Sequence, residues 1–556
     1  MTQARLPGLL TVCLSLTFVA ARGDEPDAEL DHIAQLQAAA TRDNRSPSAH
    51  WGADPDNYRM WSSHSNRLIP VYTFGTLGAG DGIDLTSCTG ANSRYRDPEK
   101  IRDIYGQLPG ETWNPAAEYC DQTDLYLIQR AALEAGRKHI FLVVFDGMDW
   151  QTTRAAAIAR TRSVAYDSGR GQGLHFQDYT AGGSTQFGFM VTSPHNEGTD
   201  VDVNLQTVTN PNGKLRGGYS ALRGGPNPWT PGLEPLYLIS RPEESPLRHA
   251  YTDSSSSASS MTAGIKTYNN AVNVDELARQ VRTIAHEAQE AGCSVGAVTS
   301  VPISHATPAA AYAHNVERDD YQDLTRDLIG LPSIAHPFQP LPGLDVLIGC
   351  GYGVTAETTK NQGDNFVPGN IYLTDADRLT VDVAHGGRYV VTTRQAGRSG
   401  AEALSEAAQQ AIASRQRLLG FFGTASGHLP YATANGDYRP VDGKSEAEKY
   451  TEADLHENPT LSEMTSAAIS VLSRNPRGFW LMMEPGDVDW ANHNNNIDDS
   501  IGAVHSGDAA VKVITDWVDA HSNWQESLLI VTADHGHYLV LTRPEDLIDP
   551  ADAAAE

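Results

Sequence analysis

Short apolar runs alternate with segments of helical periodicity from about residue 123 onward. Unbroken apolar runs of this length are typical of strands buried on both faces, and helices between such strands favour a parallel sheet. We therefore predict an α/β fold: a three-layer α/β/α sandwich with a large, mostly parallel central sheet and loop insertions. The expected strands are 139–145, 294–299, 346–348, 388–393, 479–483 and 528–532, and the expected helices are 125–135, 152–162, 276–291, 308–316, 401–413, 461–473 and 501–520.

Acidic residues follow three of these expected strands. Asp146 comes after the run 139–145, Glu484 after 479–483, and Asp534 after the run that ends near Thr532. Because the carboxyl ends of parallel strands meet at one edge of a sheet, we expect the three carboxylates to lie close together. A single Asp-Gly after a strand is more often only a turn, so the pattern matters more than any one position.

The chain of 556 residues divides into three parts by composition. Residues 1–21 combine Arg5, an apolar stretch and small residues at the end, which predicts a cleaved signal peptide and export to a periplasm or to the medium. The apolar stretch is shorter than the ~20 residues of a membrane span. Residues 22–135 predict a loop-rich N-terminal region packed on the core, to which we assign no chemistry, and 136–556 predict the catalytic domain with an insertion at about 192–247.

The net charge limits the kinds of partner that the surface can bind, and the cysteines can be interpreted for an oxidising compartment. With 41 basic and 69 acidic residues, the net charge of −28 argues against nucleic-acid binding by the general surface. An anionic substrate would then need a local positive centre, which bound metal ions can provide. In an oxidising compartment Cys88 and Cys120 could form a disulfide, whereas Cys293 and Cys350 belong to apolar runs and are expected to be buried.

Two further segments carry metal-ligand chemistry. The segment 484–493 reads EPGDVDWANH, in which Asp489 and His493 share one face of a helical turn. The segment 533–537 reads ADHGH, in which Asp534 and His535 can both reach one cation.

The segment 252–267 reads TDSSSSASSMTAGIKT and offers Ser254 as a nucleophile at the start of a helix. A flexible serine-rich linker is the alternative. The helical spacing of Met261, Ile265 and Tyr268 favours the helix.

Together these motifs resemble, in order, those of the alkaline phosphatase family, over residues 138 to 538. The resemblance implies two zinc ions and one magnesium ion. It implies that Asp146 bridges a zinc site and the magnesium site, and that Arg318 grips phosphate with its planar guanidinium. The metal ligands that it implies are Asp146, Asp534 and His535 for the second zinc, Asp489 and His493 for the first zinc, and Asp146, Thr307 and Glu484 for magnesium.

The match departs from the family at the first zinc site. The family's second histidine there comes from a segment well beyond the aspartate-histidine motif, and only His537 follows His535 in this chain. We rank His537 first for this role; the other candidates are His195, His249, His385 and His505. Trp490 stands where better-known relatives carry Lys or His.

The resemblance implies an exported phosphatase that hydrolyses small phosphate monoesters through a phosphoserine at Ser254. A phosphodiesterase of the same superfamily and a non-catalytic metal- or phosphate-binding relative are the alternatives. After signal cleavage no membrane span is expected, and a homodimer is compatible with the resemblance.

Overall fold

The computed structural model describes residues 31–60, 63–76, 84–239 and 249–553. The predicted signal peptide lies outside the described residues.

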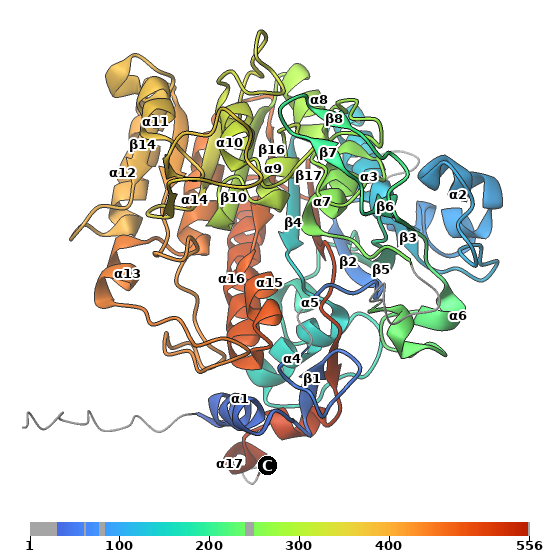
Figure 1. Cartoon of the computed structure of the whole chain (residues 1–556). Coiled ribbons are helices and arrows are strands. Elements are labelled where there is room, and N and C mark those ends of the chain that lie inside the picture. The colour runs from blue at the N-terminus through green and yellow to red at the C-terminus, as the bar shows by residue number, and fades with distance from the viewer. Residues whose placement is uncertain (1–30, 61–62, 77–83, 240–248, 554–556) are drawn as a thin grey trace, which may run out of the picture.

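A ten-stranded sheet forms the centre of the molecule (Figure 1). Seven strands, from β14 to β17 in spatial order, are parallel, whereas β2 pairs antiparallel with both β17 and β5. The predicted α/β fold with a mostly parallel sheet is confirmed. The spatial order is β14 (Tyr389–Thr393), β15 (Arg417–Phe421), β11 (Val346–Cys350), β10 (Ser294–Pro302), β16 (Phe479–Glu484), β4 (His139–Phe145), β17 (Ser527–Ala533), β2 (Ile69–Phe74), β5 (Gln186–Val191) and β3 (Cys120–Asp121).

Helices cover both faces of this sheet. Helices α12 (Gly400–Ser414), α14 (Leu461–Leu472) and α16 (Ile497–His521) pack side by side on one face. The other face carries α3 (Gln122–Glu134), α7 (Ser254–Ala263), α8 (Ile284–Glu290) and α9 (Ala306–Ala310). The strands between these layers are buried, as the near-continuous apolar sequences of β4, β16 and β17 require.

Smaller elements complete the described chain. The helices are α1 (His32–Asp43), α2 (Pro98–Tyr105), α4 (Trp150–Thr161), α5 (His175–Asp178), α6 (Ala221–Gly224), α10 (Tyr321–Ile329), α11 (Asp375–Val381), α13 (Glu452–Glu457), α15 (Asp487–His493) and α17 (Pro550–Ala553). The remaining strands are β1 (Ala49–Trp51), β6 (Asn196–Glu197), β7 (Val201–Asp202), β8 (Thr207–Val208), β9 (Leu215–Arg216), β12 (Thr355–Ala356), β13 (Gly369–Asn370) and β18 (Leu539–Leu541). Of these, β6 to β9 lie in the predicted insertion and form two short ribbons.

Two expected helices are wrong over half of their length. The helix predicted from residue 276 begins only after its N-cap Thr283, because the Asp275 side chain accepts hydrogen bonds from the backbone N–H groups of Leu277 and Arg279 and closes a local turn. The helix predicted over 308–316 ends at Ala310, and the chain beyond it becomes extended at Asn315, which pairs with Val272.

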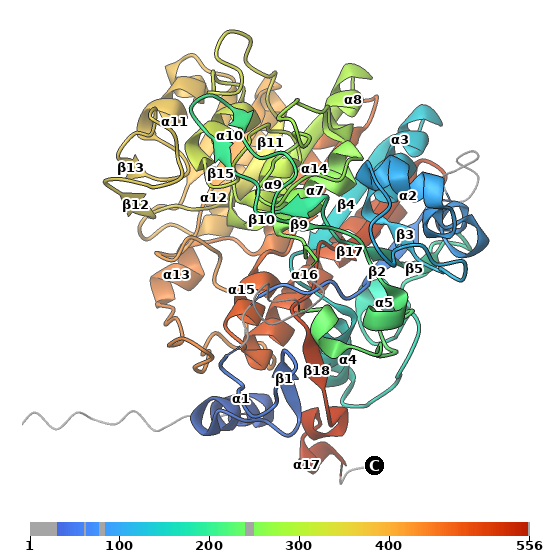
Figure 2. The same cartoon turned by 45° about the vertical axis from the view of Figure 1, so that its right-hand side comes forward.

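The N-terminal region is built into the sheet through β2 and β3 rather than resting only on its surface. Its first elements also meet the other end of the described chain: β1 pairs with β18, and His32 Nε2 lies 2.7 Å from the backbone oxygen of Asp546. Figure 2 shows α1, β1, β18 and α17 gathered at the bottom of the molecule. Residues from opposite ends of the sequence therefore share one side of the fold.

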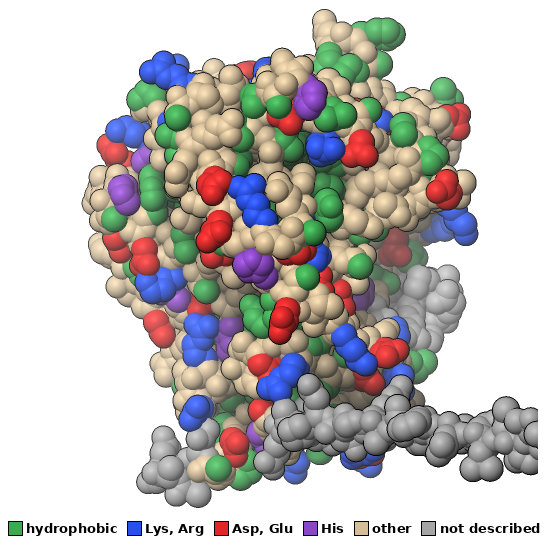
Figure 3. All heavy atoms as spheres, turned by 90° about the vertical axis from the view of Figure 1, so that its left-hand side faces the viewer, with side chains coloured by type: hydrophobic (Ala, Val, Ile, Leu, Met, Phe, Trp, Pro, Cys, Tyr) green, Lys and Arg blue, Asp and Glu red, His purple; other side chains and the backbone are tan. Residues whose placement is uncertain are grey.

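The surface and the cysteines add three facts. Figure 3 shows acidic and basic side chains interspersed on one face of the molecule. Cys88 and Cys120 have free thiols that are buried in one cluster with Asp124, so their pairing stays a prediction. Within the described ranges, no helix is long and apolar enough to cross a membrane.

Candidate metal centre and active site

The ends of three adjacent strands bring the predicted carboxylates together. Strands β16, β4 and β17 are neighbours, and Glu484, Asp146 and Asp534 lie at their carboxyl ends. The chain turns away after Asp146 at Gly147, which has φ +73°. A Cβ there would lie 2.8 Å from the His537 ring and 3.1 Å from the Asp489 Cα, so the close packing of the site requires glycine.

Ser254 is the first residue of α7 and faces these strand ends. Its Oγ lies 3.3 Å from Asp146 Oδ1 and 3.2 Å from His535 Nε2. The Asp253 side chain caps α7 by accepting the Ser256 N–H, so the helix begins at Ser254 itself. The serine-rich segment is thus a buried helix and not a linker.

One group of four donors surrounds Asp489 on α15. Asp489 Oδ1 is 2.6 Å from His537 Nε2 and 3.5 Å from His493 Nε2. The fourth member is His64, whose Nε2 lies 3.3 Å from His493 Nε2 and 3.8 Å from Asp489 Oδ1. The Nδ1–H of His64 donates to the backbone oxygen of Thr252 at 2.9 Å, which leaves the Nε2 lone pair directed at the group.

Two further donor groups share Asp146. In the first, His535 Nε2 lies 3.3 Å from Asp146 Oδ1 and 3.4 Å from Asp534 Oδ2. The second joins Asp146, Glu484 and His305, with ligand atoms within 4.8 Å of one another. Thr307, at the start of α9, has its hydroxyl near Glu484 and acts to lower the pKa of that carboxyl.

These buried carboxylates repel one another when ionised, and bound cations would offset that repulsion. Burial and the neighbouring acids raise the pKa of Asp534 to about 7 and of Glu484 to about 8. The pKa of Asp146 rises well above its usual range for the same reasons. Among the described residues, Asp146 Oδ2 and Asp534 Oδ2 are buried without a hydrogen-bond donor. Buried anions crowded in this way are stabilised by metal ions, so the donor set fits divalent cations.

Asp489 behaves differently from the other acids. Although burial acts to raise it, its pKa is held well below its ordinary value by His493 and His537. Burial lowers the pKa of His64 to about 3, with His493 and His537 contributing, and keeps its imidazole neutral. A carboxylate beside neutral imidazoles is a ligand set that zinc prefers.

Arg318 and Ser254 face the same cavity of about 560 Å³. The Arg318 guanidinium donates to Asp253 Oδ2 at 3.0 Å, and its other amino group lies 3.3 Å from His305 Nε2. These two contacts fix the Arg318 guanidinium in the cavity that Ser254 also lines. The cavity is also lined by His64, His305, Tyr321, Tyr372, Trp490 and His493.

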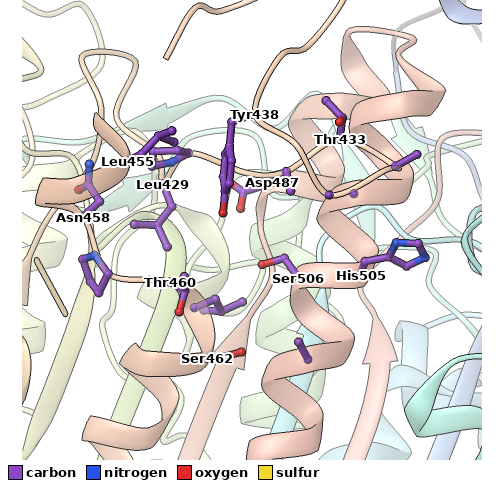
Figure 4. Close-up of a pocket in the computed structure, with 18 of the residues that line it drawn as sticks. Leu429, Thr433, Tyr438, Leu455, Asn458, Thr460, Ser462, Asp487, His505 and Ser506 are labelled. Atoms are coloured by element: carbon purple, nitrogen blue, oxygen red, sulfur yellow. The ribbon is translucent and has the colours of Figure 1, made fainter. Parts of the chain in front are cut away.

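A second cavity, of about 480 Å³, opens between α14, α16 and the segment 429–438 (Figure 4). The hydroxyl groups of Tyr438 and Ser506 point toward its centre. Asp487, at the start of α15, also lines it, but none of the predicted site residues is among the described residues around it.

All ten predicted site residues lie at this centre, but the sequence analysis missed His64. The other histidines considered for the first zinc site lie elsewhere, which corrects those alternatives. His195 contacts Asn196, His249 stacks on Tyr237, His385 lies beside Asp382, and His505 contacts the backbone of Ala156.

The sequence offered only an indirect signal for His64, which precedes the apolar run that forms β2. The antiparallel pairing of β2 with β17, which periodicity does not reveal, sets the residues before β2 beside those that follow Ala533.

The sequence profile of the alkaline phosphatase family matches residues 233–548. The chain belongs to the alkaline phosphatase family. It is 30% identical over 286 residues to alkaline phosphatase 4 of Bacillus subtilis strain 168. The aligned region covers 51% of this chain and 49% of that protein. It is 31% identical over 304 residues to the alkaline phosphatase of Escherichia coli K12, and that aligned region covers 53% of this chain and 60% of that protein.

A solved cold-active alkaline phosphatase from Shewanella sp. aligns with 72% of this chain and 68% of its own, at 21% identity and a TM-score of 0.41. The chain spans about half the length of the first alkaline phosphatase that it matches. The residues matched by the family profile include Ser254 and every predicted site residue after it, but neither Asp146 nor His64.

Proposed function

We propose that this chain is an exported alkaline phosphatase that hydrolyses small phosphate monoesters through a phosphoserine at Ser254. The observation that carries the proposal is the position of Ser254 Oγ, 3.3 Å from Asp146 Oδ1 and 3.2 Å from His535 Nε2, in the cavity that Arg318 also lines. A nucleophile, a set of metal donors and a fixed guanidinium thus face one space.

The donor groups would hold two zinc ions and one magnesium ion. Asp489, His493 and His64 would bind the first zinc, and Asp146, Asp534 and His535 the second. Glu484, Asp146 and Thr307 would hold magnesium, with His305 next to it. When bound, these cations would supply Lewis acidity that favours the serine alkoxide and positive charge that offsets the charge of the phosphoryl group.

His64 is the better candidate for the second histidine of the first zinc site than His537. His537 Nε2 is at hydrogen-bond distance, 2.6 Å, from Asp489 Oδ1, which suits a residue that orients the ligand. His64 has a free Nε2 lone pair directed at His493 and Asp489 because its Nδ1–H is held by the Thr252 carbonyl. We therefore assign His64 to the metal and His537 to the orientation of Asp489.

Arg318, Ser254 and the start of α7 each have a separate role in the proposed reaction. Arg318 binds two phosphoryl oxygens and is kept in position by Asp253. Ser254 Oγ gives its proton to water and attacks phosphorus, so that a serine O–P bond forms while the ester O–P bond breaks. The leaving alkoxide takes a proton from water and departs as the alcohol. A water molecule then attacks the phosphoserine, which releases inorganic phosphate and restores the hydroxyl. The N–H groups at the start of α7 lie beside the phosphoryl oxygens throughout.

The experiment compares wild type and Ser254→Ala, both loaded with zinc and magnesium, on p-nitrophenyl phosphate and bis-p-nitrophenyl phosphate. We expect rapid hydrolysis of the monoester by the wild type and a loss of at least about 10³-fold in the variant, as for removal of other catalytic nucleophiles. Ser260→Ala is the matched control, because this buried serine of the same helix donates to the backbone oxygen of Ser256. Faster hydrolysis of the bis-ester would favour a diesterase, and phosphate binding without turnover would favour the non-catalytic alternative.

A further inference from the structure

A second group of metal-ligand side chains lies around α10. It consists of His314, Asp327 and His336, and we call it the α10 cluster. His314 lies on the segment between α9 and α10, Asp327 is on α10 itself, and His336 belongs to the loop that follows α10. The proposed catalytic centre uses none of these residues.

The imidazole of His314 is held with one nitrogen free for a ligand role. Its Nε2 lies 2.9 Å from the backbone oxygen of Val281, which can only accept, so Nε2 carries the proton. The lone pair on Nδ1 therefore points at His336 Nε2, 3.1 Å away. A carbonyl that fixes the tautomer of a histidine is a usual companion of metal binding.

The spacing of the three ligand atoms suits one small cation. His336 Nε2 lies 3.1 Å from His314 Nδ1 and 3.7 Å from Asp327 Oδ2, and the ligand atoms lie within 4.8 Å of one another. Two ligands at zinc distances on a tetrahedral ion are about 3.3 Å apart. The proposed first zinc site of the same molecule has a comparable separation, 3.3 Å between His64 and His493.

The Asp327 carboxyl group is held in a fixed orientation by two hydrogen bonds. Its oxygens accept hydrogen bonds from the Ser333 hydroxyl at 2.5 Å and from the backbone N–H of His314 at 3.0 Å, and its side chain is fully buried. The cluster thus combines one buried carboxyl group with two imidazole nitrogens.

A hydrogen bond from His336 Nε2–H to His314 Nδ1 would explain the 3.1 Å separation alone. That hydrogen bond would use only two of the three ligand atoms, whereas a divalent cation would use all three at once.

We propose that the α10 cluster binds one zinc ion, with His314 Nδ1, His336 Nε2 and Asp327 as ligands and a water molecule in the fourth position. His336 is slightly exposed, with 12% of its side chain accessible, so the ion and the water can enter from that side. The ion would fasten the loop after α10 to the segment that leads, four residues beyond His314, to Arg318.

The test measures zinc bound by the full-length protein after equilibration with zinc chloride and removal of free metal. His336→Ala is the informative variant because this side chain lies on a surface loop, and His385→Ala is the control because His385 is an exposed histidine on another element. We expect His336→Ala to bind one zinc ion fewer than wild type and His385→Ala to bind the same number. Equal zinc content in wild type and His336→Ala would overturn the proposal.

Crystallography of the wild type soaked in zinc chloride gives a second measurement that does not depend on a variant folding. We expect an anomalous peak at the zinc edge within bonding distance of the two imidazoles and Asp327. An empty position in crystals whose catalytic centre is filled would also overturn the proposal. The zinc ion of the α10 cluster can be counted separately from those of the proposed catalytic centre. His64→Ala should lose zinc at the catalytic centre and keep the zinc ion of the α10 cluster, so failure of one proposal is distinguishable from failure of the other.

Discussion

At the scale of single residues, His64 would complete the proposed first zinc site. We predict that His64→Ala loses one zinc ion and at least about 100-fold in monoester hydrolysis, because a ligand nitrogen is removed. His537→Ala should instead keep the ion at high zinc concentration and bind it about 10 to 100-fold more weakly, as expected for an orienting residue. Zinc titration of the two variants separates the roles, and full zinc content in His64→Ala would show that the assignment is wrong.

Gly147 allows the first turn of the site to pass close to its neighbours. We predict that Gly147→Ala destabilises the protein by at least about 3 kcal/mol and lowers activity, because a left-handed backbone and contact with the His537 ring act together. Gly136→Ala is the matched control: it has φ +81° and nothing within 4 Å of the added Cβ, so it should lose only about 1–2 kcal/mol. Urea unfolding measures both, and equal losses would contradict the role given to the contact.

The positions of the acidic residues that follow strands could be predicted, because each depends only on the sequence immediately before it. Asp146, Glu484 and Asp534 each end an apolar run, and parallel pairing brings such ends together without further information. His64 was not found in this way, because its position depends on the pairing of β2 with β17, more than 450 residues later. A pairing over that distance leaves no periodic pattern in either segment.

At the scale of elements, the N-terminus of α16 contains a buried acid that should make stability depend on pH. Burial raises the pKa of Asp498 to about 7 from an ordinary value of 3.8, and Asp31 and Asp437 add to this effect. The folded state then holds a proton that the unfolded state releases above about pH 4, so this residue's contribution to stability falls as pH rises to about 7.

We predict that Asp498→Asn removes this dependence. The amide keeps the acceptor for the Ala434 N–H and carries no charge, so the variant should gain about 1–3 kcal/mol over wild type at pH 8 and much less at pH 5. Urea unfolding at both pH values measures the change, with exposed Asp516→Asn on the same helix as the control. A gain that is the same at both pH values would argue against titration of Asp498.

The limits of element prediction follow from the same physics. Expected helices such as 461–473 and 501–520 agree with α14 and α16, because each buries an apolar stripe along most of its length. The segment 276–283 has helical spacing as well, yet Asp275 binds the nearby backbone N–H groups and overrides it. Side chains that compete for backbone hydrogen bonds are hard to weigh from periodicity alone.

At the scale of the whole molecule, metal ions should hold together a site that joins many elements. We predict that removal of divalent cations with EDTA lowers the melting temperature by roughly 5–10 °C, because the buried carboxylates at the ends of β4, β16 and β17 then repel one another. Addition of zinc and magnesium should restore it. Calorimetry of metal-free and reconstituted protein checks this, and an unchanged transition would mean that the carboxylates need no cations for stability.

The place of β2 beside β17 also bears on how the protein is made. The segment that carries His64 emerges early from the ribosome, while its neighbour in the sheet is synthesised near the end. Until β17 is synthesised, β2 can pair only with β5, and the donor groups that follow β17 are absent from the side of His64. A nascent or C-terminally shortened chain should therefore be inactive and prone to proteolysis, and activity should arise only after synthesis of the chain is almost finished.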